Sequence, residues 1–172
     1  RAAAIAERLL SDDLFSGWGV RTMAASDRAF NPLTYHRGTV WPHDTSIAAA
    51  GLARYGFWDE SRALVRGLFT AARFFDWSLP EVFAGFPRRE TPFPIAYPTA
   101  ARPQAWAAGA PVLCLQLLLG LRPDREARSL VSDAPAGSPA WAGDLELNGV
   151  RAFDRVWNAT ARVDGPVVVE EA

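Results

Sequence analysis

The amino-acid sequence predicts an all-α protein built of helical hairpins, with a small β appendage at its C-terminal end. Two observations support this fold class. Apolar residues recur at helical spacing in residues 2–10, 45–55 and 59–75, and a nearly wholly apolar stretch follows at 103–121. Alternating and β-branched stretches appear after residue 123. The helices are therefore expected to form the core, and the strands a tail.

The second and third predicted helices form an antiparallel hairpin. The helix at 45–55 follows Asp44, which suits an N-cap, and ends before Gly56, which suits a C-terminal stop. Asp59 is expected to cap the next helix, which ends near residue 75. Since only a few residues connect the two helices, they are expected to pack against each other.

The fourth predicted helix, at 103–121, is apolar on nearly every side. Pro103 suits its first turn, while Pro111 is expected to kink or break it. A membrane span needs about 20 apolar residues, and Gln104 and Gln116 interrupt a stretch that is already short. We therefore expect this helix to be buried on every side inside a large helical domain, and no membrane partner is predicted.

The end of the chain has a different pattern. Residues 144–150 alternate between apolar and polar around an Asn-Gly turn signal, and residues 166–169 end in a β-branched run. The predicted domains are therefore a helical domain at residues 1–122 and a linker with a short β-rich tail at residues 123–172.

The composition is that of a soluble globular protein. Of the 172 residues, 49% are hydrophobic and 22% are charged. The net charge of -1 gives no electrostatic reason to expect nucleic acid or an anionic membrane as a partner. The single cysteine, Cys114, cannot form an internal disulfide, which fits a reducing compartment, so a cytoplasmic protein is predicted. The first residues read as the middle of a helix without an initiator methionine, so the chain is expected to begin inside a larger protein.

Two long loops, at residues 11–44 and 76–102, carry the residues that indicate a function. Loops of this length in compact domains are usually functional or disordered, and the aromatic residues of the first loop favour an ordered one. Hydrolysis of a glycoside requires two carboxyl groups, an acid and a base, and sugar rings pack on aromatic faces. Both loops contain carboxyl and aromatic side chains, which together indicate a carbohydrate cleft. His36 and His43 lack further ligands at a suitable spacing, so neither a metal nor another cofactor is predicted.

Four blocks of sequence carry a resemblance to a known family. They read FSGWGVRT at 15–22, NPLTYHRGTVWPHD at 31–44, LPEVFAGFPRR at 79–89 and PQAWAAGA at 103–110. In this order they resemble bacterial amylo-alpha-1,6-glucosidase (glycogen-debranching) proteins, which belong to the six-hairpin glycosidase superfamily. The resemblance extends over residues 10–121. It implies the C-terminal part of an (α/α)6 toroid and the hydrolysis of α-glucans with inversion.

The resemblance also implies a catalytic role for Glu81, at the position of the general base. The general acid of such enzymes comes from an earlier hairpin, which is expected to lie outside this chain. The missing N-terminal part is therefore an expected partner, and the isolated chain is expected to be inactive. Asp44 is the best internal candidate for the second carboxyl group, although an aspartate before a helix is also the expected N-cap.

The loop around Glu81 is apolar, which predicts a partly desolvated carboxyl group with a raised pKa. The alternative for this residue is a structural pair with Arg88, Arg89 or a helix end.

Ten residues are candidates for contact with an oligosaccharide or polysaccharide substrate. They are Trp18, Arg21, Tyr35, His36, Arg37, Trp41, His43, Phe86, Gln104 and Trp106. The alternative for the aromatic residues is a core that anchors the loops, and for the arginines it is salt bridges within them. Two other functions stay open. One is a carbohydrate-binding or scaffold module without turnover, and the other, less favoured, is a membrane-associated helical protein.

Overall fold

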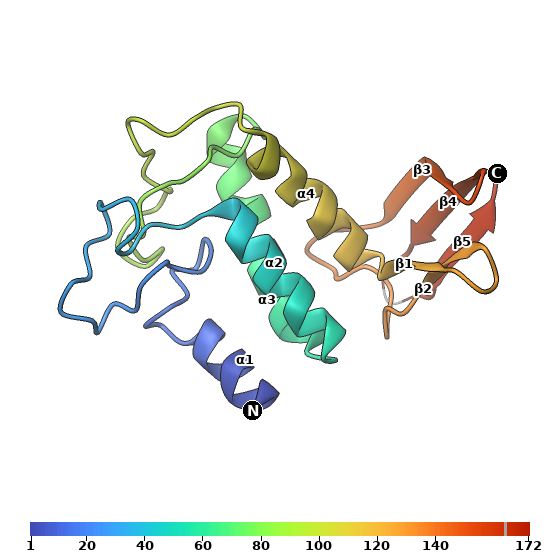
Figure 1. Ribbon diagram of the computed structural model, residues 1–172, viewed down its shortest axis with the longest axis horizontal. Coiled ribbons are helices and arrows are strands. Elements are labelled where there is room, and N and C mark those ends of the chain that lie inside the picture. The colour runs from blue at the N-terminus through green and yellow to red at the C-terminus, as the bar shows by residue number, and fades with distance from the viewer. Residues whose placement is uncertain (164) are drawn as a thin grey trace. The chain divides into compact units, whose positions relative to one another are not determined.

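The computed structural model of the protein describes residues 1–163 and 165–172 (Figure 1). Its helices are α1 (Ala2–Leu10), α2 (Pro42–Arg54), α3 (Trp58–Ala72), the 3-10 turn η1 (Arg73–Phe75) and α4 (Ala105–Leu118). Its strands are β1 (Leu121–Asp124), β2 (Ser129–Ser132), β3 (Leu145–Ala152), β4 (Arg155–Ala161) and β5 (Val167–Glu171). The chain divides into two units, Arg1–Cys114 and Leu115–Ala172.

The predicted all-α class, and with it the partial (α/α)6 toroid, is wrong. In the described part of the chain, helices account for 32% of the residues, and strands together with isolated bridge residues account for 21%. The strands form two antiparallel sheets, so the fold is mixed. The strand content was underestimated because alanine, which is depleted in strands, occupies core positions of β4. Ala159 and Ala161 are buried there, while Thr160 between them is only half-buried. This is the period of two that a half-buried strand requires.

The helices of the predicted hairpin are present, and α2 packs against α3 across a connection of three residues. Helix α2 begins at Pro42, three residues earlier than predicted, because the fixed φ of proline suits the first turn. Trp41 is therefore the N-cap, and Asp44 lies inside the first turn instead of capping it. An acidic residue at this place still interacts favourably with the helix dipole.

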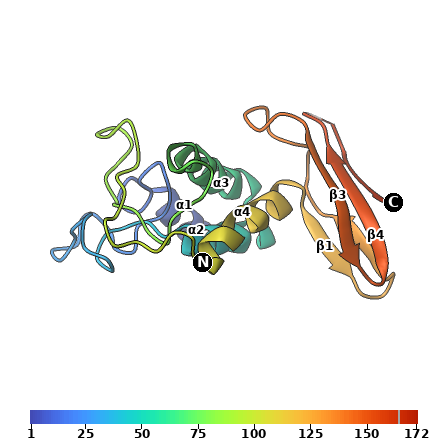
Figure 2. The same cartoon turned by 90° about the horizontal axis from the view of Figure 1, so that it is seen from above.

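Isolated β-bridges hold the two long loops together, although neither loop contains a regular strand. Val40 of the first loop pairs with Phe83 of the second, through hydrogen bonds of 2.9 Å and 3.0 Å between their backbones. Further bridges join Val40 to Arg21 and Phe83 to Ala96. The loops lie side by side in both views (Figures 1 and 2). Residues that are far apart in the sequence are thereby brought to one place.

Close backbone contacts fix the first loop on α3. A Cβ atom at Gly67 of α3 would lie 2.8 Å from the carbonyl oxygen of Trp18, so only glycine permits this approach. Trp18, Leu64 and Leu68 are almost fully buried. The first loop therefore contributes to the hydrophobic core of its unit, which explains how so long a loop remains ordered.

Helix α4 is shorter than predicted and is not buried on every side. Trp106 is 45% exposed and Val112 is 66% exposed, whereas Ala107, Ala110 and Cys114 are buried. An apolar helix carries no polar stripe that would mark its outer face, so its sequence did not reveal which side is exposed. Pro111 lies within the helix without ending it. Among the described helices, none is long and apolar enough to cross a membrane.

In the second unit, β1 pairs with β2, and β3, β4 and β5 form a second antiparallel sheet. Figure 2 shows the arrows of β1, β3 and β4 lengthwise. The buried cluster of this unit consists of Leu119, Leu121, Ala159 and Ala161, with Leu145, Leu147, Val167 and Val169 packed against it. The Asn-Gly signal was misinterpreted, because it marks a register shift within β3 and not a turn. The turn follows at Phe153 and Asp154, whose φ angles of 54° and 61° fit a type I′ hairpin.

Candidate functional site

The backbone of the first loop holds Tyr35 next to Trp41. The hydroxyl of buried Thr39 donates to the carbonyl oxygen of Tyr35 at 2.6 Å, and the indole N–H of Trp41 donates to the same oxygen at 3.2 Å. The rings of Tyr35 and Trp41 then meet edge to face, with centroids 4.8 Å apart. Since both bonds close within six residues, the local chain fixes the backbone at Tyr35, and the contact with Trp41 orients its ring.

Glu81 of the second loop is the partner of this tyrosine. The hydroxyl of Tyr35 donates to Oε1 of Glu81 at 2.5 Å, and the backbone N–H of Ala101 donates to Oε2 at 3.1 Å. The backbone N–H of Glu81 in turn donates to the carbonyl oxygen of Ala101 at 2.9 Å. Both oxygens of the carboxyl group are therefore held by donors from different segments, and a short bond to a carboxylate is typical of charge assistance.

These bonds set the protonation of Glu81 in the direction opposite to the prediction. The hydrogen bond from Tyr35 and, after it, the one from Ala101 lower the pKa of Glu81 and outweigh its desolvation. The predicted rise in pKa was wrong because hydrogen bonds to the charged form favour that form more than partial burial disfavours it. The same contact raises the pKa of Tyr35 to about 12. At neutral pH the pair is a carboxylate and a neutral phenol.

Aromatic side chains surround this pair. The ring of His36 stacks on Trp41 with centroids 5.7 Å apart, and the ring of His43 stacks on Trp106 with centroids 4.6 Å apart. Trp41 also meets Trp106 edge to face. We call Tyr35, His36, Trp41, His43, Tyr97 and Trp106 the aromatic cluster. Within it Trp106 and His36 are exposed, so the cluster offers flat π-faces beside a carboxylate.

Gln104 joins the site at the start of α4. Its side chain hydrogen-bonds to Glu81 and lowers the pKa of that residue further. Its Oε1 atom is buried and has no hydrogen-bond partner in the described part of the chain. A buried acceptor without a partner is unfavourable.

The structure brings seven of the predicted site residues together, namely Tyr35, His36, Trp41, His43, Glu81, Gln104 and Trp106. The other five predicted residues are Trp18, Arg21, Arg37, Asp44 and Phe86. Trp18 is 1% exposed and packs against Phe74 and Arg88. Phe86 is half-buried and Arg37 is exposed, both on the loops.

Arg21 is buried and ties the two loops together. Its Nε donates to the carbonyl oxygen of Gly85 at 2.7 Å and its Nη1 to that of Asp12 at 2.9 Å. Burial lowers its pKa. Its donors are directed at backbone carbonyl oxygens, which makes Arg21 a clamp between the loops in this structure.

Asp44, the second candidate carboxyl group, is exposed one residue after His43. In the part of the chain that the structure describes, no hydrogen bond or ion pair joins it to Glu81. The alternative for Glu81 was a pair with Arg88 or Arg89, and in the structure both arginines contact other residues. Arg88 lies over the ring of Trp18, and Arg89 pairs with Asp12 at 3.4 Å.

Sequence reasoning missed Tyr97. Its ring meets that of Tyr35 edge to face at 5.7 Å. The only signal was an aromatic residue in the proline-rich second loop, and no pattern there distinguishes it from a residue exposed by chance. The bridge between Phe83 and Ala96 is what carries Tyr97 to the site.

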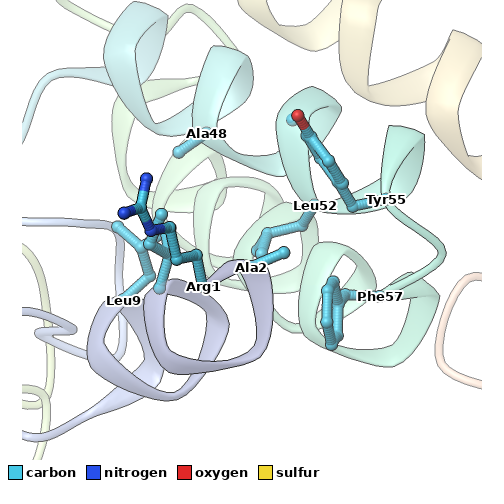
Figure 3. Close-up of a pocket in the computed structure, with 9 residues that line it drawn as sticks. Arg1, Ala2, Leu9, Ala48, Leu52, Tyr55 and Phe57 are labelled. Carbon is cyan, nitrogen blue, oxygen red and sulfur yellow. The ribbon is translucent and has the colours of Figure 1, made fainter.

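A cavity of about 360 Å³ lies elsewhere, between α1 and α2 (Figure 3). It is lined by Arg1, Ala2, Ile5, Leu9, Ala48, Gly51, Leu52, Tyr55 and Phe57. None of these side chains is a carboxyl group or an imidazole, so the cavity has no acid or base for hydrolysis. Among the described residues, no group of three or more His, Cys, Asp or Glu side chains could hold a metal ion.

Comparison with known proteins adds one match. Residues 1–77 match the family model of the mannosylglycerate hydrolase MGH1-like glycoside hydrolase domain. A search of the curated proteins finds no match to the chain. The matched segment contains α1, α2, α3 and the first long loop, and therefore Tyr35, Trp41 and His43 of the aromatic cluster. Over these residues the chain is similar to a glycoside hydrolase domain.

Proposed function

We propose that this protein hydrolyses glycosides and that Glu81 is the general base. The observation that carries the proposal is the Glu81 carboxyl group, held at 2.5 Å by Tyr35 beside the stacked rings of the aromatic cluster. The glycoside hydrolase match over residues 1–77 supports the same reaction class. The alternative, a carbohydrate-binding module without turnover, would use the aromatic rings but has no need of a fixed carboxylate.

The electrostatics of Glu81 favour a base over an acid. Its hydrogen bonds to Tyr35 and Ala101 lower its pKa, so the group is ionised at neutral pH and accepts a proton. A general acid of a glycosidase needs the opposite, a raised pKa that keeps its proton until the leaving group takes it. In the proposed reaction, Glu81 removes a proton from water as that water attacks the anomeric carbon, and a second carboxyl group protonates the departing oxygen.

Asp44 is the internal candidate for that second group, and a residue outside these 172 is the other. The roles require two carboxyl groups on opposite faces of the sugar ring, separated by roughly 6.5–9.5 Å in inverting enzymes. We propose inversion, which the resemblance of the loop motifs implies. An NMR spectrum of the first-formed sugar checks this, since an α-glycoside must then release the β-anomer.

Two substrate classes compete. The motif resemblance favours an α-glucan, cleaved as in glycogen debranching. The matched family model is named for a mannosylglycerate hydrolase, which favours a small glycoside of glycerate. Assays of sugar release from malto-oligosaccharides and from mannosylglycerate, at matched concentrations, distinguish them by their kcat/KM values.

Replacement of Glu81 by glutamine in the intact protein tests the proposed role. Glutamine keeps the shape but accepts no proton, so Glu81→Gln is expected to lower kcat by about 10²- to 10⁴-fold and to leave oligosaccharide binding nearly unchanged. Glu90→Gln, an exposed carboxyl group of the same loop, is the matched control and is expected to retain the parent kcat. Turnover by Glu81→Gln within threefold of the parent would refute the assignment.

A further inference from the structure

The hydroxyl of Tyr35 contacts the proposed general base but takes no part in the proposed proton transfers. A phenol beside a general base could contact the sugar, as the aromatic character of the first loop predicts for this residue. In this structure the hydroxyl is already engaged, because it donates its only proton to Oε1 of Glu81 at 2.5 Å. The Tyr35 ring meets the rings of His36, Trp41 and Tyr97 edge to face, so it cannot turn away without loss of this packing.

We propose that Tyr35 is a positioning residue, whose hydroxyl fixes the Glu81 carboxylate in one orientation and leaves acceptor sites of that carboxylate open to water. An ionised carboxyl group has about four lone-pair sites. The hydroxyl of Tyr35 occupies one site on Oε1, and the backbone N–H of Ala101 occupies one on Oε2. With both oxygens held, a water at a remaining site approaches a carboxylate of fixed orientation. The inference rests on the proposed role of Glu81 as base.

The electrostatics of the Tyr35–Glu81 pair agree with this geometry. The bond lowers the pKa of Glu81 and raises the pKa of Tyr35 to about 12, so the proton stays on the phenol. The titratable groups near the pair are His36, whose ring lies 4.6 Å from that of Tyr35, and Tyr97. Arg102, which adjoins Ala101, pairs with Asp76 at 3.3 Å. The described hydrogen-bond donors to the carboxylate, the Tyr35 hydroxyl and the Ala101 backbone N–H, are neutral. Of the two, Tyr35 lowers the pKa of Glu81 more.

The test measures the carboxyl group directly, apart from any activity. Glu81 is followed by carbon NMR in the 172-residue chain, with the signal assigned by its loss in Glu81→Gln. In Tyr35→Phe, which removes only the hydroxyl, the titration midpoint of Glu81 is expected to rise above that of the parent. Tyr55→Phe, at a phenol that is 73% exposed, is the control and is expected to leave the midpoint unchanged. An unchanged midpoint in Tyr35→Phe would overturn the proposal.

The reciprocal measurement covers the case in which Tyr35→Phe does not fold. The ultraviolet absorbance of tyrosinate in the parent is expected to show one phenol that titrates at about 12, and Glu81→Gln is expected to bring it back toward the ordinary value of 10.0. The absence of a late-titrating phenol in the parent would overturn the proposal as well. Neither readout depends on turnover, so failure here is distinct from failure of the proposed reaction.

Measurements of kcat and KM test whether the Tyr35 hydroxyl acts by positioning Glu81. With the intact protein, Tyr35→Phe is expected to lower kcat about 10- to 100-fold with little change in KM, and to move the acidic limb of the pH profile to higher pH. A loss that appears only in KM would show instead that the hydroxyl binds substrate, and would contradict a positioning role.

Discussion

Trp41 and Trp106 belong to the same cluster but differ in burial. Trp41 is 6% exposed and its indole N–H is bonded, whereas Trp106 is 45% exposed. Trp41→Ala is therefore expected to lower the free energy of unfolding by roughly 3–5 kcal/mol, the usual effect of truncating a buried tryptophan. Urea denaturation measures this. If the loss were below about 1 kcal/mol, with oligosaccharide binding abolished, Trp41 would be a sugar platform and not an anchor.

Trp106 is expected to behave in the opposite way. Its exposed ring lies on His43, so Trp106→Ala is expected to change stability little and to weaken oligosaccharide binding about 3- to 10-fold. Trp77→Ala removes a ring that is 67% exposed outside the cluster and serves as the control. Calorimetric titration of the two variants should differ, and equal affinities would argue against Trp106 as a binding residue.

The carboxylate of Glu81 also predicts a pH dependence of stability. Its hydrogen bonds, first that from Tyr35, lower its pKa below the ordinary value of 4.5. The resulting stability is fully present above the unfolded-state pKa and is lost as the pH falls through the folded-state pKa. The advantage of the parent over Glu81→Gln in free energy of unfolding is therefore expected to shrink in acid below pH 4.5. An advantage that stays constant in urea titrations across this range would show that the bonds do not favour the carboxylate.

At the scale of elements, the contact between the two long loops depends on glycine. A Cβ atom at Gly85 would lie 1.6 Å from the carbonyl oxygen of Gly38, which is backbone and cannot rotate away. Gly85→Ala is expected to separate the loops and to destabilise the chain by about 2 kcal/mol or more. Gly51→Ala in α2, where a Cβ meets nothing within 4 Å, is the matched control and is expected to stabilise by up to about 1 kcal/mol. Thermal melts with the same sign for both variants would contradict this account.

The elements themselves were predictable where one periodic pattern spanned several turns. Residues 2–10 form α1 with the predicted bounds, and α2 and α3 form the predicted hairpin. Prediction failed where the local signal was ambiguous. Asn-Gly is equally suited to a turn and to a bulge, since both need a positive φ, and Gly149 has a φ of 77° inside β3. Only the pairing of β3 with β4 decides between them.

At the scale of the whole molecule, every described contact of Glu81 lies within residues 1–114. A change in the core of the second unit is therefore expected to leave the site intact. Ala161→Asp places a charge at a position that is 0% exposed and is expected to destabilise the second sheet by at least about 2 kcal/mol. Hydrogen exchange is expected to show lost protection in β4, while the NMR titration of Glu81 stays that of the parent.

Thr160→Asp, on the other face of the same strand, is the control for that experiment and is expected to retain protection. A shift of the Glu81 midpoint in Ala161→Asp would show that the two units are energetically coupled. The boundary predicted between residues 122 and 123 lies within β1 and stays a prediction for the limits of independently folding domains.

The sequence by itself determined which residues could form a site. The aromatic and carboxyl residues of the two loops, Tyr35, Trp41 and Glu81 among them, were identifiable because their chemical types and motif order do not depend on the fold. Tertiary structure decided how they act. The pairing of Val40 with Phe83 brings Tyr35 to Glu81, and that contact reverses the direction in which burial alone would move the pKa. The pKa and the exposed fraction of a side chain depend on the groups that lie near it in space. Tyr35 and Glu81 are such neighbours, although they are 46 residues apart in the chain.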